Sequence, residues 1–139
     1  MRRILVDAGP LVAILSRDDE QHTVCVDALQ EMPGPLLSCW PVITEAAWLL
    51  RRSPRAVQQL LRKIDGSFLE LLPLAASEAS DLAALMKRYE DIRPQLADAA
   101  LVYLANREQI ETIFTLDQRD FSIYRSGRRR TFNLVPEMV

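Results

Sequence analysis

The chain has 139 residues, of which 49% are hydrophobic and 26% charged, and its formal net charge is −2. This length is sufficient for one hydrophobic core, so we expect a single domain over residues 1–139. The balance of charge excludes a global basic field for nucleic acid, and one histidine with two distant cysteines argues against a zinc site.

Apolar runs separated by turn residues predict strands and helices that alternate along the chain. The first strand is ILV at 4–6, and Pro10 opens the helix that follows it. Further strands are predicted at 36–40, 68–74, 112–116 and 132–135, and further helices at 20–32, 41–52, 54–64, 77–89 (with Ser77 as N-cap) and 94–107. This alternation of helices with short apolar strands predicts an α/β sandwich around a mostly parallel central sheet.

Single acidic residues interrupt the apolar segments at four places. Asp7 and Asp117 each end an apolar strand, whereas Glu45 and Asp98 each lie alone in a long apolar helix. We expect such a helix to be buried, and an ionised carboxylate there is costly unless it is paired, hydrogen-bonded or bound to a cation. Each acid also has a structural alternative: Asp7 as a helix cap, Asp117 in an Asx turn, and Glu45 and Asp98 near the positive end of a helix dipole.

The predicted topology gathers these acids at one edge of the sheet. Strands end there and the helices that carry Glu45 and Asp98 begin there, and this is the edge at which ligands bind in open α/β sheets. A cluster of oxygen ligands without histidine or cysteine suits Mg²⁺ or Mn²⁺, which can lower the pKa of bound water for attack on phosphorus. Thr115, two residues before Asp117, is placed to steady a carboxylate or a bound water.

Four sequence segments together resemble the acidic motifs of PIN-domain ribonucleases, most closely the VapC-type toxins of toxin–antitoxin pairs. The segments are ILVDAGPLVAIL, VITEAAWLL, LADAALVYLA and IFTLDQRDF, in the order typical of that family. The resemblance implies a three-layer α/β/α sandwich with a five-stranded parallel sheet, and endoribonuclease activity that depends on Mg²⁺ or Mn²⁺.

Carried over position by position, the resemblance places the acidic quartet at Asp7, Glu45, Asp98 and Asp117. Thr115 matches a hydroxyl position near the last acid, and Asp120 lies in the RDF tail of the last motif. One departure is the Ala-Gly-Pro at 8–10, where the family often has a serine or threonine after the first aspartate.

The resemblance also implies partners: an RNA substrate, a small antitoxin that masks the acidic pocket, and a second copy of the chain in a homodimer. The helical segments TVCVDALQEM and AVQQLLRKI offer candidate apolar surface, although we expect most of it to pack on the sheet. No segment approaches the roughly 18 apolar residues of a membrane span, so we expect a cytoplasmic protein without membrane contact.

Two groups of arginines are candidates for contacts with RNA phosphate, or are simply solvated. One group follows the Glu45 helix, and the other lies around Gly127 in a segment expected to form a mobile loop or hairpin-like turn. The groups are Arg51, Arg52, Arg55 and Arg62, and Arg125, Arg128, Arg129 and Arg130.

Other functions of α/β proteins fit less well. A phosphoacceptor domain needs a lysine on a late strand, but Lys63 and Lys87 lie in predicted helices, and no G-x-G-x-x-G motif follows the first strand. The remaining alternative to a nuclease is a non-catalytic PIN-like scaffold that binds RNA or a protein.

Overall fold

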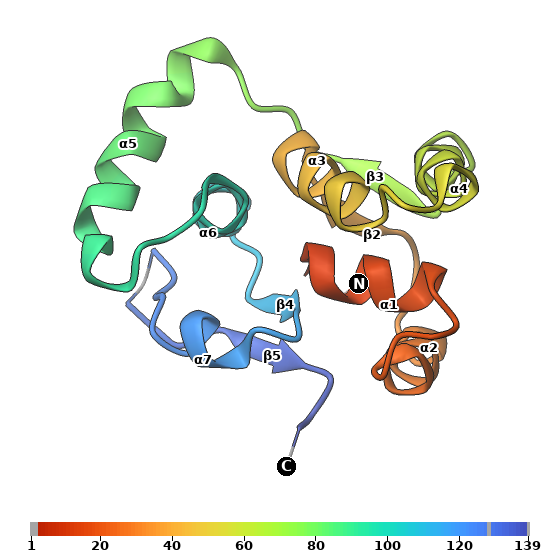
Figure 1. Cartoon of the computed structure of the whole chain (residues 1–139). Coiled ribbons are helices and arrows are strands. Elements are labelled where there is room, and N and C mark those ends of the chain that lie inside the picture. Colours follow the sequence, from red (N-terminus) through yellow and green to blue (C-terminus); the bar gives the residue numbers. More distant parts are fainter. Residues whose placement is uncertain (1–2, 128, 139) are drawn as a thin grey trace.

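The computed structural model describes residues 3–127 and 129–138, and it places five parallel strands in one sheet of order β3-β2-β1-β4-β5 (Figure 1). The strands are β1 (Ile4–Val6), β2 (Leu36–Ser38), β3 (Leu69–Leu71), β4 (Thr112–Phe114) and β5 (Asn133–Val135). The predicted α/β class with a parallel sheet is therefore confirmed. The strands at 36–40, 68–74 and 112–116 are shorter than predicted.

Helices connect the strands and pack around the sheet. They are α1 (Ala8–Leu15), α2 (His22–Gln30), α3 (Trp40–Leu49), α4 (Pro54–Asp65), α5 (Ala79–Arg88), α6 (Leu96–Glu108) and α7 (Gln118–Phe121), with 3₁₀ turns η1 (Ala76–Glu78) and η2 (Glu90–Ile92). Figure 1 shows α5 beyond α6, on the side of the molecule away from α4. None of the helices in the described ranges is long and apolar enough to cross a membrane.

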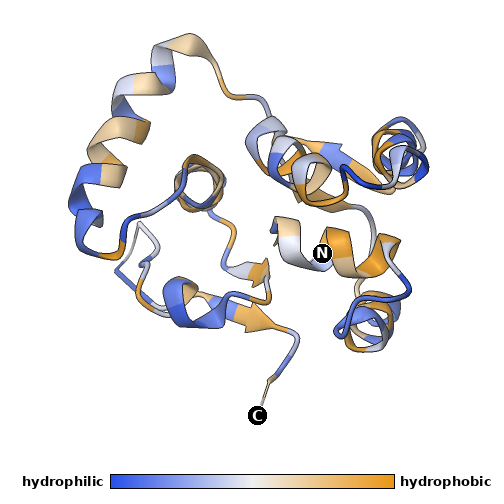
Figure 2. Cartoon of the chain, viewed as in Figure 1, coloured by the Kyte–Doolittle hydropathy of each residue, from blue (hydrophilic) through white to orange (hydrophobic). Residues whose placement is uncertain are grey.

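The core consists of one cluster of apolar side chains on the central strands and the helices that cover them. All residues of β1 and β4 are buried. Figure 2 shows hydrophobic colours over much of α1 and β5, whereas α2 and α4 carry both colours. Helix α6 is buried along most of its length, as its sequence predicts, because small alanines let it pack closely against its neighbours.

Helix α3 is not buried on all sides, and that prediction is wrong. Val42, Ile43 and Ala46 face the core, but Trp40 is 59% exposed and Trp48 is 62% exposed. An apolar composition therefore does not distinguish core from exposed surface in this helix.

Two predicted helix starts also differ from the structure. Ser77 is not an N-cap; the Glu78 carboxylate accepts a hydrogen bond from the Ala75 N–H (2.9 Å), and η1 precedes α5. Helix α6 begins two residues after Pro94, because Arg93 adopts a left-handed conformation and Gln95 is extended at the N-cap.

Aromatic packing connects the segment that follows α7 to the turn before α6. The buried Tyr124 ring lies 5.3 Å from the Phe121 ring and 4.9 Å from the Tyr89 ring, both in edge contact. The Tyr89 hydroxyl also accepts a hydrogen bond from the Arg125 N–H (3.2 Å). These contacts set the position of α7 relative to the start of α6, and both elements carry candidate site residues.

Candidate active site

Asp7 and Thr115 meet at the carboxyl edge of the sheet because β1 and β4 are parallel neighbours. Val6 pairs with Phe114, so the next residue on each strand continues the same register. Asp7 is buried, and its Oδ1 accepts from the Ala8 N–H while its Oδ2 accepts from Thr115 Oγ1, both at 2.8 Å. Asp7 is therefore the N-cap of α1, and it also lines the same pocket as the other acids.

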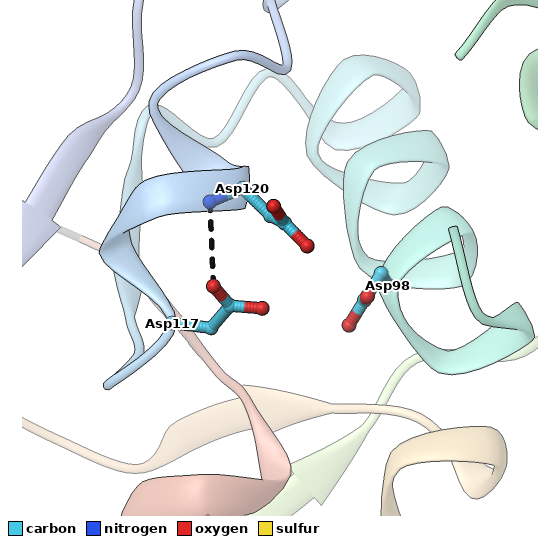
Figure 3. Close-up of side chains that lie close together, drawn as sticks. All are labelled: Asp98, Asp117 and Asp120. Carbon is cyan, nitrogen blue, oxygen red and sulfur yellow. Dashed lines mark hydrogen bonds between the residues drawn. The ribbon is translucent and has the colours of Figure 1, made fainter. Parts of the chain in front are cut away.

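Three further carboxylates approach one another closely. Asp117 is the N-cap of α7 and accepts from the Asp120 N–H (3.3 Å), while its own N–H donates to Thr115 Oγ1 (3.0 Å). Asp98 lies in the first turn of α6, and Figure 3 shows it opposite Asp117 and Asp120. Oxygen atoms of these three side chains lie within 4.8 Å of one another.

Glu45 completes a shared pocket with a volume of about 440 Å³. It comes from the second turn of α3, and Leu49, one turn later, lines the same pocket. The structure thus brings all members of the sequence-derived quartet to one pocket, although only two of them belong to the close oxygen cluster. The lining residues are Asp7, Ala8, Gly9, Glu45, Leu49, Arg93, Gln95, Asp98, Leu116, Asp117 and Asp120.

Three of the carboxylates in this pocket, Asp7, Glu45 and Asp98, resist ionisation. Burial, followed by the negative charges of Asp7, Glu45, Asp117 and Asp120, raises the pKa of Asp98 from its ordinary value of 3.8 to about 7. Burial is also the largest cause that raises the pKa of Asp7 and of Glu45, and neighbouring carboxylates add to both shifts. A cation bound among these groups would reverse the penalty, because it favours their charged forms.

The chemistry of the pocket fits a hard divalent cation. Its possible ligands are carboxylate oxygens, which suit Mg²⁺ or Mn²⁺. The lone histidine, His22, makes its ring contact with the Ala13 carbonyl (2.7 Å), and Cys25 and Cys39 are buried as thiols. Neither sulfur nor imidazole lines the described pocket.

None of the described arginines in the two predicted groups lines this pocket. Arg51 stacks on Trp48, with its guanidinium carbon 4.0 Å from the ring centroid, and Arg52 is exposed. Arg129 is exposed, and Arg128 lies outside the described residues. A bridge between Arg125 and Thr131 closes this segment like a hairpin.

Sequence reasoning missed two polar lining residues, Arg93 and Gln95, and underestimated the part of Asp120. Arg93 and Gln95 lie in the turn before α6, and their only sequence signal is that they shortly precede Asp98. Asp120 was placed beside the quartet, whereas in the structure it belongs to the close oxygen cluster.

Comparison with known proteins shows the family to which the chain belongs. The profile of the PIN domain family matches residues 4–126. Ribonuclease VapC26 of Mycobacterium tuberculosis (strain ATCC 25618 / H37Rv) is 30% identical over 135 residues, which cover 96% of this chain and all of the relative. The crystal structure of M. tuberculosis VapC20, described as a sarcin-ricin loop cleaving toxin, superposes with a TM-score of 0.73 at 16% identity, covering 79% of this chain and 86% of that one.

The chain thus belongs to the PIN-domain family. Within that family it belongs with the VapC-type proteins, as the similarity over almost its full length indicates.

Replacing Thr115 with valine should destabilise the protein and displace two carboxylates. The change leaves Asp7 Oδ2 and the Asp117 N–H without their partner, and we expect a loss of about 1–3 kcal/mol in the free energy of unfolding. Urea denaturation measures this loss. Titration with Mn²⁺ should show affinity about 10–100-fold weaker, as is typical when a residue that supports metal ligands is removed.

Thr112→Val is the matched control for this substitution. Thr112 is also buried on β4, but its hydroxyl makes only a 3.3 Å contact with Asn133 Nδ2 among the described residues. We expect a smaller loss of stability and unchanged Mn²⁺ affinity. Equal effects of the two substitutions would contradict the role assigned to Thr115.

Asp98→Asn should flatten the pH dependence of stability in the absence of divalent cations. The Asp98 pKa is raised from 3.8 to about 7, so the folded protein retains this proton over a range in which the unfolded chain has lost it. Wild-type stability therefore falls as the pH rises through that range, and the loss is complete above about pH 7. In EDTA, we expect the fall in Tm between pH 5 and pH 8 to be several degrees smaller in Asp98→Asn.

Asp81→Asn is the control for the pH experiment, because Asp81 is an exposed acid on α5 that does not line the pocket. This variant should keep the wild-type pH dependence. If Asp98→Asn also keeps it, repulsion among the pocket carboxylates does not govern the stability of the cation-free protein.

Proposed function

We propose that residues 1–139, folded as one domain, form a Mg²⁺- or Mn²⁺-dependent endoribonuclease that acts as the toxin of a type II toxin–antitoxin pair. The observation that carries the proposal is the convergence of acids from four separate elements on one pocket at the carboxyl edge of the sheet. Ribonuclease VapC26, which is similar over almost the whole chain, supports the same activity by its name. An RNA substrate and an antitoxin partner place the protein in the cytoplasm.

The proposed cation ligands are Asp7, Glu45, Asp98 and Asp117, and the position of Asp120 adds it to them. A bound divalent cation supplies charge neutralisation at a phosphodiester and lowers the pKa of water. Thr115 holds the Asp7 carboxylate in one orientation and fixes the backbone at Asp117. In the cation-free protein, the pKa of Asp98 is raised to about 7 and that of Glu45 is also raised, so both carboxylates hold a proton more strongly than ordinary acids do. A bound cation would lower both pKa values and leave the carboxylates charged, as a group that accepts a proton from water must be.

Cleavage of RNA should require both the cation and the pocket acids. With purified protein, RNA and Mn²⁺ or Mg²⁺, we expect Asp98→Asn and Glu45→Gln to lower the rate by about 10²–10⁴-fold, the usual contribution of a general acid or base. EDTA should abolish cleavage, whereas Asp81→Asn should cleave at the wild-type rate. RNA binding without metal-dependent cleavage by the wild type would favour the alternative, a non-catalytic scaffold.

The antitoxin proposed here is a small protein that masks the acidic pocket. The pocket carries five carboxylates, Asp7, Glu45, Asp98, Asp117 and Asp120, so a partner segment that enters it needs lysine or arginine side chains. Such a segment would relieve the same repulsion that a divalent cation relieves. Binding of the antitoxin would therefore both inhibit the toxin and stabilise its folded state.

We also propose that the protein forms a homodimer through the exposed aromatic face of α3. Trp40 and Trp48 are two helical turns apart and largely exposed, whereas the α2 and α4 segments each expose one large apolar residue, Val24 and Leu61. Aromatic side chains are enriched in the buried centres of protein interfaces. A second copy that covers this face would remove both indoles from water.

Substitution of the two tryptophans should therefore change the mass in solution. We expect the wild type to elute as a dimer in size-exclusion chromatography with light scattering, and Trp40→Ser with Trp48→Ser to elute as a monomer. Leu61→Ser, an exposed apolar residue on α4, should remain dimeric. A monomeric wild type at micromolar concentration would contradict the dimer.

A further inference from the structure

Arg93 is the one basic residue among the described residues that line the carboxylate pocket. It occupies the turn between η2 and α6, five positions before Asp98, and its backbone N–H donates to the Glu90 carbonyl (3.0 Å). The described arginines of the two groups named from the sequence do not line it. Arg93 is therefore the side chain best placed to meet an anion that approaches this pocket.

The Arg93 guanidinium has no partner within residues 3–127 and 129–138. No salt bridge or side-chain hydrogen bond there includes it, although several carboxylates line the same pocket. Arg107, in contrast, binds Glu78, and Arg51 stacks on Trp48. The donors of Arg93 thus remain available to a ligand.

The backbone at Arg93 adopts a conformation that suits glycine better. Its φ is 51° and its ψ is 61°, in the left-handed region that few residues with a Cβ occupy. A glycine would make the same turn with less strain, so the backbone conformation does not explain why an arginine occupies this position. Residues held in such conformations are concentrated at functional sites.

We propose that Arg93 contacts the phosphate of the RNA strand bound at the pocket and holds it against the repulsion of the carboxylates. A planar guanidinium matches two phosphate oxygens at once and cannot lose its charge near neutral pH. This inference rests on the proposed ribonuclease function. It assigns substrate positioning to a residue that comes from neither of the predicted arginine groups.

Arg93→Gly separates the loss of the guanidinium from damage to the fold. Glycine is favoured at this φ, so with Mg²⁺ present we expect a Tm equal to or above that of the wild type. The kcat/KM for RNA cleavage should fall about 10–100-fold, as expected for one charge-assisted hydrogen bond. Arg93→Lys, which keeps the charge but loses the planar fork, should give an intermediate value.

Gln109→Gly is the matched control, because Gln109 also has a left-handed backbone (φ 56°) and ends α6 away from the pocket. It should raise Tm and leave kcat/KM unchanged. If wild-type protein cleaves RNA and Arg93→Gly cleaves it equally well, Arg93 makes no useful phosphate contact and the inference is wrong. If the wild type cleaves no RNA under any metal condition, the proposed function itself is wrong and this inference fails with it.

The salt dependence of RNA binding gives a second readout that a purely structural role would not change. Binding of a fluorescein-labelled, random-sequence single-stranded RNA is measured with Asp98→Asn, alone and combined with Arg93→Gly. One lost phosphate contact should reduce the slope of log Kd against log salt concentration by about 0.7. An unchanged slope would overturn the phosphate contact, even if cleavage were slower.

Discussion

The pairing of β1 with β4 is the constraint on which the site depends. It sets Asp7 beside Thr115, and the Thr115 hydroxyl then serves two partners, the Asp7 carboxylate and the Asp117 N–H. A buried carboxylate is tolerated there because both of its oxygens accept hydrogen bonds. The same bonds that offset the cost of burial also orient the carboxylate, so stability and function depend on one small network.

Repulsion among the pocket carboxylates, added to the cost of burying them, favours the binding of positive charge in this pocket. Burial first, and the negative charges of neighbouring carboxylates second, raise the pKa values of Asp7, Glu45 and Asp98. A divalent cation or a basic segment of an antitoxin would supply that charge, whereas the Arg93 guanidinium makes no ion pair with these carboxylates among the described residues. Natural proteins commonly accept such strain at active sites, where a relaxed arrangement would have less affinity for the ligand.

Helix α3, about three turns long, has one surface that lines the pocket and another that exposes aromatic side chains. Glu45 and Leu49 line the pocket, while Trp40 and Trp48 face outward. A partner that covers the outward face would sit close to the pocket and could alter access to it. Assembly and catalysis are thereby linked through one helix in the proposed dimer.

The sequence by itself determined the features that depend on near neighbours along the chain. Apolar triplets such as Ile4–Val6 form buried strands, alternating helices make the sheet parallel, and each acid ends a strand or occupies an early turn of a helix. Those local facts suffice to bring Asp7, Glu45, Asp98 and Asp117 to one edge, because parallel strands all end on the same side.

Only the tertiary structure decided which side chains meet across that edge and which apolar faces remain exposed. Asp120 joins Asp98 because aromatic packing around Tyr124 positions α7 against the start of α6, and the left-handed turn at Arg93 sets a cation in the pocket. Trp48 is exposed for a similar reason: no described element covers that side of α3. These outcomes depend on contacts between residues far apart in the chain, which local patterns of hydrophobicity and charge do not specify.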